Sequence, residues 1–385
     1  MKIKNLYLFL IFLLLWACAI RESTNNTTET SEITTNVKII NQISIPCDTL
    51  PYNFEYSSIL KKDNELYFVG LDESTNALYF YSITSQKFSY KIQKSKEGSD
   101  KVIIKDFYIH TQDSIFLLDH YGKKVQLIDS KGKIINNLKF KNEQNRNVVE
   151  ALSSKRMAFF GKSNRMILPS FVEIEDTKNE FYEHGFSSLF AMTKDSLLLL
   201  TEIGRYPKEY IPIENSYYYS TYPDMIKYGH KLILNFSNHH TLFTIDMENK
   251  MNKIIEWKSN YLKEDFERLS LDNDIQQASN YISTNGFYTR ITVDEETETL
   301  YRIVKHTQPL KNVEGKLNQY LECGFSIIYG KLDEPNPKEV LLEKGKYVPY
   351  VVHSIGNNQL LISLENPFNP NNEENKLQFE IIELK

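Results

Sequence analysis

The chain has 385 residues and a formal net charge of −5 at pH 7. This mild acidity gives no electrostatic case for nucleic-acid binding, which calls for a basic patch. Aromatic residues make up 13% of the chain, with 25 Tyr and 22 Phe, and this richness is typical of β-strands.

The N-terminus has a basic start followed by a short apolar run. Lys2 and Lys4 precede an apolar stretch at residues 6–17, shorter than the roughly 20 residues that span a bilayer. The stretch ends in Leu15-Trp16-Ala17-Cys18, which resembles the lipobox of bacterial lipoproteins. The resemblance implies that residues 1–17 are a signal peptide, removed before Cys18, which then carries acyl chains. The alternative is an ordinary cleaved signal peptide with an unrelated cysteine.

A polar segment follows the cysteine. Residues 21–36 are nearly all polar apart from Ile33, so residues 18–36 are predicted to form a flexible tether. No second hydrophobic stretch of membrane length occurs, and residues 37–385 are predicted to form one folded domain. Because two or more acyl chains anchor a protein stably, we expect membrane attachment through Cys18.

Residues 112–140 show the clearest strand pattern. Strands are predicted at 114–119, 124–128 and 133–140, because the apolar runs are short and quickly broken. Gly122 and Gly132 lie in the two connecting turns, where glycine can adopt a positive φ. The stretch therefore predicts an antiparallel meander rather than a βαβ unit.

Weaker copies of this meander recur every 50 to 70 residues or so, which is typical of β-propeller blades. Other predicted strands lie at 37–46, 65–70, 77–83, 87–92, 165–174, 187–202, 230–236, 241–246, 253–257, 286–293, 299–305, 323–332, 338–343, 359–364 and 376–384. The last four are grouped into a sixth repeat. The pattern predicts an all-β, six-bladed β-propeller, with seven blades as an alternative and paired β-sandwiches as the rival fold. The strand at 37–46 is expected to pair with the last blade and close the ring.

One predicted blade also carries a family likeness. Residues 106–135, DFYIHTQDSIFLLDHYGKKVQLIDSKGKII, resemble a blade of NHL-type and TolB-like propellers. The shared features are a strand, an Asp…Gly-x-x-V-Q turn and strand, and then Asp-x-x-Gly-Lys. With the lipobox and the length, the chain is similar to six-bladed propeller lipoproteins of Gram-negative envelopes. This resemblance implies a fold and a location, and it brings no activity.

Residues 261–282 break the strand pattern. Their apolar residues, at 262, 266, 269, 275, 278 and 282, recur at spacings near a helical turn. Acidic residues come early in the segment, as is typical of a helix start. We expect a helical insert between two blades, lying on one face.

Linear catalytic motifs are missing from the sequence. It contains no G-x-S-x-G, P-loop or H-E-x-x-H pattern. Asp272-Asn273-Asp274 lacks the Gly and Glu that complete a calcium loop, so it is interpreted as a turn. His239 and His240 are neighbours in an expected turn, and adjacent residues rarely share one metal ion. We therefore predict no cofactor and no metal site.

Two cysteines, Cys47 and Cys323, remain after Cys18. An oxidising envelope permits a disulfide between them, and a single pair of cysteines does not establish one. A disulfide and two buried thiols are both compatible with the sequence.

The richest polar and aromatic segment spans residues 204–223. Its Gly and Pro residues indicate a loop, and it contains Arg205, Tyr206, Tyr218 and Tyr222. Exposed Tyr with Arg is the chemistry of recognition surfaces, including stacking against sugars or peptides. These four are the candidate ligand-binding residues, and Arg205 is expected to face the central funnel. The alternative is that alternate tyrosines, such as Tyr217 and Tyr219, form the core of a blade strand.

These observations predict a non-enzymatic binding or scaffold propeller that recognises a protein or glycan partner through loops on one face. The rival is a hydrolase or lyase acting on glycans or peptides, with its side chains gathered from different blades. Three or more Asp, Glu, His or Arg side chains converging in the funnel would favour the enzyme. We expect a monomer anchored at the outer membrane, on its periplasmic face or at the cell surface.

Overall fold

The computed structural model describes residues 37–47, 49–119, 124–141, 147–148, 157–171, 174–175, 177–248 and 252–385. The signal peptide, Cys18 and the tether lie outside these ranges, and their assignments stay predictions. Among the described residues strands dominate, and α3 (Ile275–Thr284) is the one α-helix. No helix in these ranges is long and apolar enough to cross a membrane.

Three sheets are meanders of four antiparallel strands, each strand pairing with the next in sequence. The first holds β2 (Tyr56–Lys62), β3 (Glu65–Asp72), β4 (Ala77–Ser82) and β5 (Lys87–Gln93). The second holds β16 (Asp224–Tyr228), β17 (Lys231–Asn235), β18 (Thr241–Asp246) and β19 (Asn252–Glu256). The third holds β21 (Phe287–Asp294), β22 (Thr299–Lys305), β23 (Phe325–Lys331) and β24 (Lys338–Leu342).

A larger sheet of nine strands contains two meanders joined edge to edge. One meander is β6 (Ile104–Thr111), β7 (Ser114–Asp119), β8 (Lys124–Ile128) and β9 (Ile134–Lys141). The other is β12 (Arg165–Phe171), β13 (Ser187–Met192) and β14 (Ser196–Ile203), with short β10 (Asn147–Val148) and β11 (Ala158–Phe160) paired to β12. The junction is a short parallel pairing of β14 with β9, from Ser196↔Lys139 to Leu198↔Lys141.

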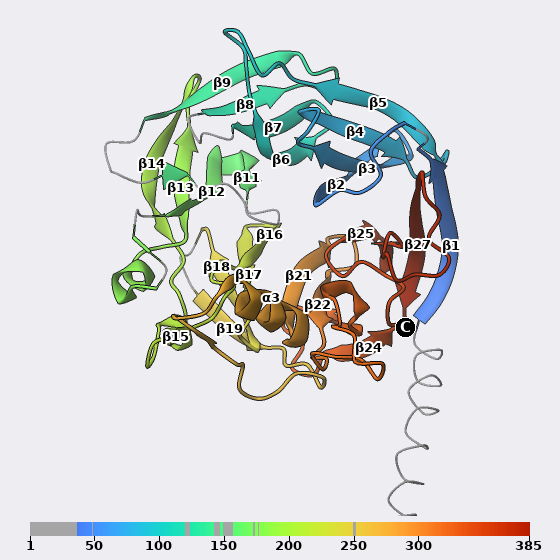
Figure 1. Ribbon diagram of the computed structural model, residues 1–385. Coiled ribbons are helices and arrows are strands. Elements are labelled where there is room, and N and C mark those ends of the chain that lie inside the picture. Colours follow the sequence, from blue (N-terminus) through green and yellow to red (C-terminus); the bar gives the residue numbers. More distant parts are fainter. Residues whose placement is uncertain are drawn as a thin grey trace, which may run out of the picture.

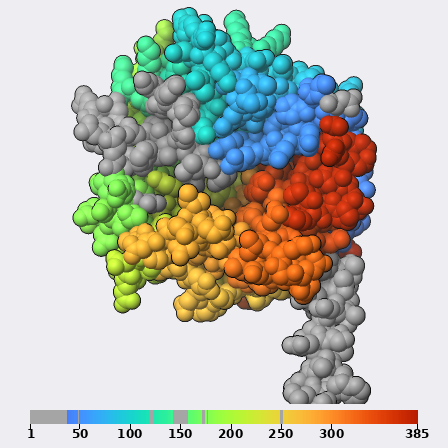
Figure 2. Space-filling model, viewed as in Figure 1, coloured from blue at the N-terminus to red at the C-terminus, as the bar shows by residue number. Residues whose placement is uncertain are grey.

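The last sheet joins the two ends of the folded domain. It contains β25 (Val352–Gly356), β26 (Gln359–Ser363) and β27 (Lys376–Leu384), and β1 (Val37–Pro46) pairs with β27. The register runs from Val37↔Leu384 to Pro46↔Lys376. Figure 1 shows β1 and β27 side by side, and in Figure 2 the blue and red ends of the described chain adjoin on the surface. The predicted pairing of residues 37–46 with the last strands is confirmed.

The sheets stand around a common centre in a propeller-like ring, with β2, β6, β16, β21 and β25 nearest the centre (Figure 1). Apolar side chains fill the space between neighbouring sheets. In one such cluster the rings of Phe68 (β3) and Phe379 (β27) lie 4.8 Å apart. The all-β, propeller-like expectation is confirmed, and the rival sandwich, in which two sheets face each other, is wrong.

The strand connections divide between the two faces of the ring. The connections on one face, here called the turn face, are short reversals, and they include residues 63–64, 83–86, 112–113, 129–133, 161–164, 193–195, 229–230 and 357–358. Long connections lie on the opposite face, here called the loop face, at residues 49–55, 94–103, 204–223, 257–286, 306–324, 343–351 and 364–375. The division arises because strands alternate in direction within each sheet while the inner strands run the same way. For example, Thr292 of β21 accepts the backbone N–H of Ser354 in β25, and Asp294, further along β21, accepts that of Asn358 in the reversal after β25.

The long connections contain short elements of their own. These are β15 (Ser216–Tyr217) paired with β20 (Leu269–Ser270), and the 3₁₀-helices η2 (Asn179–Glu183), η3 (Lys208–Tyr210) and η4 (Tyr320–Glu322), with η1 (Gly161–Ser163) on the turn face. The predicted helix over residues 261–282 is wrong in its first half. The Arg268 guanidinium donates to the Ile211 carbonyl (3.1 Å), and β20 pairs with β15, so this half is tied to a neighbouring connection. The helix begins only at Ile275, where Asp274 accepts the Gln277 N–H as N-cap (2.7 Å).

The predicted strands match the outer parts of the sheets better than the inner parts. The expected sixth repeat is divided, because β23 and β24 belong to the sheet of β21 whereas β26 and β27 belong to that of β25. The inner strands β2, β16 and β25 were not predicted. Buried polar residues such as Ser57, Asp224 and His353 interrupt their apolar pattern.

Substitution of Ile45 tests the closure of the ring. Ile45 is fully buried in β1, so Ile45→Ala removes packed methylene groups and is expected to lower the free energy of unfolding by about 2–5 kcal/mol. Ile39→Ala is the control on the same strand, because Ile39 is 49% exposed and should change stability by less than about 0.5 kcal/mol. Urea-induced unfolding measures both, and equal effects would contradict a closure that depends on buried packing.

Candidate functional site

A cavity of about 490 Å³ opens on the loop face, where the inner strands begin. We call it the funnel. Polar and aromatic side chains line it: Asn53, Glu55, Ser220, Ser237, Phe287, Thr289, Tyr320 and Tyr350. Six of them come from the connections that precede β2, β16 and β25 or follow β17 and β22, and Phe287 and Thr289 lie at the start of β21. Because so many separate segments meet here, the funnel is a product of the ring and not of any one motif.

Serine and threonine hydroxyls form one side of the funnel. The hydroxyl of Ser220 donates to that of Ser237 (3.2 Å), which links the connection before β16 to the one after β17. Thr289, near the start of β21, reaches the Pro349 carbonyl (3.4 Å) in the connection before β25. These contacts hold hydroxyl groups from two sheets at the cavity wall, where they can donate to or accept from a bound molecule.

Glu55 and Tyr350 set the electrostatics of the opposite side. Burial raises the pKa of the Glu55 carboxyl, the nearby Glu73 carboxylate raises it further, and Lys105 opposes both. The pKa of the Tyr350 phenol is raised by burial and by Glu55. The phenol therefore stays protonated as a donor, and the carboxyl takes up a proton more readily than an exposed glutamate.

A pair of aromatic rings backed by a buried cation forms a further wall. The rings of Phe287 and Tyr320 lie 6.3 Å apart at an interplanar angle of 28°. The Lys305 ammonium lies 5.0 Å and 5.3 Å from their centroids and donates to the carbonyls of Ser283 (3.1 Å) and Asn285 (2.7 Å). Burial lowers the pKa of Lys305 to about 8. The contacts of the ammonium fix the two rings from behind, so they present a rigid apolar surface.

A charged cluster lies buried behind the funnel wall, on the inner strands. Arg290 of β21 donates to the Tyr350 carbonyl. Its guanidinium interacts electrostatically with the carboxylates of Asp224 on β16 and Asp106 on β6. Burial lowers the pKa of Arg290, and the two carboxylates partly offset this effect. Asp224 also accepts the backbone N–H of Ile291 (2.8 Å). The cluster therefore ties three inner strands together and fixes the backbone that carries Tyr350.

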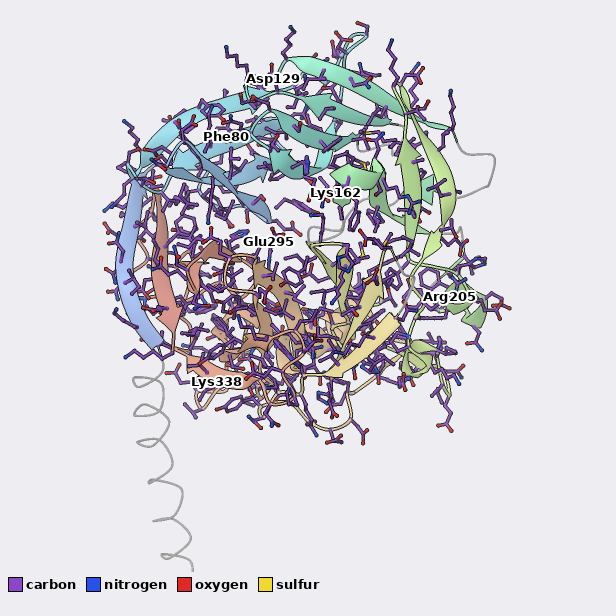
Figure 3. The ribbon with its side chains drawn as sticks, turned by 180° about the vertical axis from the view of Figure 1, so that it is seen from behind. Phe80, Asp129, Lys162, Arg205, Glu295 and Lys338 are labelled. Atoms are coloured by element: carbon purple, nitrogen blue, oxygen red, sulfur yellow. The ribbon has the colours of Figure 1, made fainter. Side chains whose placement is uncertain are left out.

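The four candidate residues of the 204–223 segment do not line the funnel. Figure 3 shows Arg205 on the outside of the ring, away from its centre, so the expectation that it faces the funnel is wrong. Its guanidinium lies 3.4 Å from Glu202. Tyr206 and Tyr218 are 9% and 7% exposed and Tyr222 is half-buried, all in one aromatic core cluster. The alternative interpretation places Tyr217 and Tyr219 in the core, whereas Tyr219 is 44% exposed and the buried tyrosines are Tyr206 and Tyr218.

Arg205 and Tyr206 instead border a groove of about 530 Å³ between β14 and the pair β18 and β19. The groove also contains Ile254, which is 68% exposed. It lies at the junction of two neighbouring sheets, whereas the funnel gathers residues from several. Sequence reasoning missed the funnel residues because each comes from a different connection and none stands out in its own segment.

The described residues contain no group of three or more His, Cys, Asp or Glu side chains that could hold a metal ion. His240 bonds to the Tyr288 hydroxyl (2.8 Å) and to the Lys263 carbonyl (3.0 Å), so it has a structural role. Cys47 and Cys323 are buried thiols and form no disulfide.

Tyr218 and its neighbour Tyr219 provide a matched test of the core assignment. Tyr218 packs its ring against Tyr210 (5.1 Å) and under the Arg268 guanidinium (4.4 Å), whereas Tyr219 is 44% exposed. We expect Tyr218→Ala to lower the free energy of unfolding by about 3–5 kcal/mol, the range for buried aromatic truncation. Tyr219→Ala should cost far less. Chemical denaturation of both variants checks this, and a stable Tyr218→Ala would contradict the core assignment.

Glu365 and Asn53 both line a small void of about 10 Å³. The Glu365 carboxyl makes the free energy of unfolding depend on pH. Burial raises the pKa of its carboxyl to about 7, although the Gln378 N–H that it accepts lowers it. The folded protein thus holds this proton more tightly than the unfolded chain, whose pKa is about 4.3, and stability falls as pH rises from about 4.3 to about 7. Glu365→Gln keeps an acceptor oxygen and should raise the melting temperature at pH 8 but not at pH 4.5. Exposed Glu374→Gln is the control, and equal shifts at both pH values would contradict the assignment.

Comparison with known proteins places the chain in a family. Residues 30–321 match the family model for a domain of unknown function, DUF4221. The structure is similar to that of a DUF4221 member from Bacteroides vulgatus ATCC 8482, with a TM-score of 0.73, 20% identity, and coverage of 91% of this chain and 99% of that chain. It is also similar to a Bacteroides fragilis NCTC 9343 protein inferred to be exported, with a TM-score of 0.55, 12% identity, and coverage of 91% and 97%.

No curated protein sequence matches the chain. At these identities the two solved structures support the fold alone. The family match covers most of the 385 residues, and it agrees with the propeller-like ring of sheets. This chain therefore belongs to the DUF4221 family.

Proposed function

We propose that the protein is a non-enzymatic, lipid-anchored binding propeller of the cell envelope that recognises a glycan in the funnel. The observation that carries the proposal is the lining of the 490 Å³ cavity, which combines hydroxyl, amide and carboxyl groups with aromatic rings. Binding sites for small molecules are concave and combine apolar walls with a few placed polar groups. Sugar rings present hydroxyls at their edges and apolar C–H groups on their faces, so they match both parts of this lining.

The charge of the funnel favours an uncharged ligand over an anionic one. Glu55 is the single ionisable carboxylate among the lining residues, Glu73 adds negative potential near it, and Lys105 offsets part of that potential. An acidic ligand would meet repulsion from both carboxylates, while a neutral sugar hydroxyl can donate to the Glu55 carboxylate.

A second candidate function is that of a hydrolase or lyase acting on a glycan or peptide. The raised pKa of Glu55 favours it, because catalytic acids are tuned in this direction. Glycosidases need a pair of carboxyl groups flanking the bond, however, and the described lining supplies one. Asp106, Asp224 and Arg290 are buried behind the wall and not in the cavity. Binding is therefore the better-supported function.

The finer fold assignment and the location are part of the proposal. We propose a six-bladed propeller of the TolB-like or NHL-like type. Counting each half of the nine-stranded sheet as one blade supports six blades, and the likeness of residues 106–135 supports the type. The lipobox at residues 15–18 supports anchoring through Cys18 at the outer membrane. The similarity to a Bacteroides fragilis protein inferred to be exported is consistent with a place outside the cytoplasm.

Binding of the protein to an array of neutral and acidic oligosaccharides tests the proposal, followed by calorimetry with the strongest binder. Loss of a charge-assisted hydrogen bond at Glu55→Gln is expected to weaken that binding about tenfold or more. Glu314→Gln, on an exposed turn of the loop face outside the funnel, is the matched control and should leave affinity unchanged. An array on which no sugar binds, or equal affinities for Glu55→Gln and the wild type, would refute recognition of a glycan in the funnel.

A further inference from the structure

The described chain enters the ring on the turn face, at the end of β1 that is remote from the funnel. The pairing register establishes this step by step. Val37 pairs with Leu384 of β27. The residue before Leu384, Glu383, pairs on its other side with Gln359 of β26. Gln359 pairs in turn with Gly356, the last residue of β25. Val37 therefore lies on the same side of the ring as the 357–358 reversal.

The funnel lies at the other end of the same sheet. Tyr350, which lines the funnel, directly precedes β25, so the whole of that strand separates it from Gly356. At about 3.3 Å per residue this separation is roughly 20 Å. Pro46, at the far end of β1, lies on the loop face, because Cys47 donates its N–H to the Asn375 carbonyl (2.7 Å) of the 364–375 connection.

We propose that the lipid anchor presents the turn face to the membrane and points the funnel away from it. The inference rests on the anchoring through Cys18 proposed above. A flexible tether over residues 19–36 would have a root-mean-square span of roughly 23 Å, so the ring stays beside the bilayer and attached by its turn-face side.

This orientation restricts the partner. In this orientation the body of the ring separates the funnel from the lipid headgroups of the bilayer that carries the anchor. Its ligand is therefore a glycan free in the surrounding compartment or displayed on an opposing surface.

The opposite orientation, with the loop face toward the membrane, would be stabilised by exposed apolar side chains. Exposed apolar side chains project from the loop face, including Val313, Leu317 and Ile275, which are 105%, 52% and 91% exposed. Contact of these side chains with lipid would turn the funnel toward the membrane.

Energy transfer to the bilayer distinguishes the two orientations. The full-length, lipidated protein is bound to phosphatidylethanolamine and phosphatidylglycerol vesicles that carry an acceptor dye on the headgroup. A donor dye is attached in separate variants at Lys162→Cys on the turn face and at Val313→Cys on the loop face. Both positions are exposed, and Figure 3 labels Lys162. The native thiols Cys47 and Cys323 are buried and should not label.

We expect transfer from position 162 to exceed transfer from position 313 about twofold or more, given a tether span of roughly 23 Å. Equal transfer, or stronger transfer from position 313, would overturn the orientation while leaving the anchor intact. Flotation of the same vesicles, with Cys18→Ala as the control, reports the anchor separately. A wild-type protein that floats no better than Cys18→Ala would refute anchoring, and the orientation with it.

Discussion

The pairing of β1 with β27 is the constraint on which the rest of the structure depends. It brings residues 37–46 against residues 376–384 and so converts a row of sheets into a closed ring. Buried Glu380 reinforces the joint. Its carboxylate accepts hydrogen bonds from Gln42 (2.9 Å) and Tyr347 (2.5 Å), and it pairs with Lys346 (3.0 Å). Without closure the edges of the first and last sheets would be exposed, and the connections that form the funnel would not meet.

A fully buried arginine fixes the long connections to this frame. Arg302 donates to the Asn235 side chain (2.8 Å) and to the carbonyls of His240 (2.7 Å) and Trp257 (2.6 Å), and it stacks 3.2 Å from the Tyr288 ring. Burial lowers its pKa to about 10, which leaves it charged at neutral pH. Because it joins the 236–240 connection to the start of the 257–286 connection, it holds Ser237 at the funnel. The loop face is therefore preorganised for binding.

The predictable and unpredictable parts of the fold differ in their surroundings. Strands such as β4 and β7 pack apolar neighbours on both faces, so their sequences, ALYFYS and SIFLLD, are apolar runs that reveal strands. Inner strands such as β16, DMIKY, have one side toward the axis, where Asp224 meets Arg290, and their apolar pattern is broken. The prediction of a recognition surface in the tyrosine-rich segment at residues 204–223 was wrong for a different reason. Composition alone does not distinguish a buried aromatic cluster around Tyr210 from an exposed recognition surface.

The funnel was not predictable from any single segment, and the reason bears on its chemistry. Glu55 and Tyr350 are some 300 residues apart in the sequence and meet only because the ring closes. A site assembled in this way changes its specificity through substitutions in separate connections, while the charged cluster of Arg290 keeps the inner strands fixed. Partial burial is the largest cause of the raised pKa of the Glu55 carboxyl, and the Glu73 carboxylate adds to it. Closure of the ring therefore sets the electrostatics of the funnel, because it brings the Glu55 carboxyl close enough to Tyr350 to raise the pKa of that phenol.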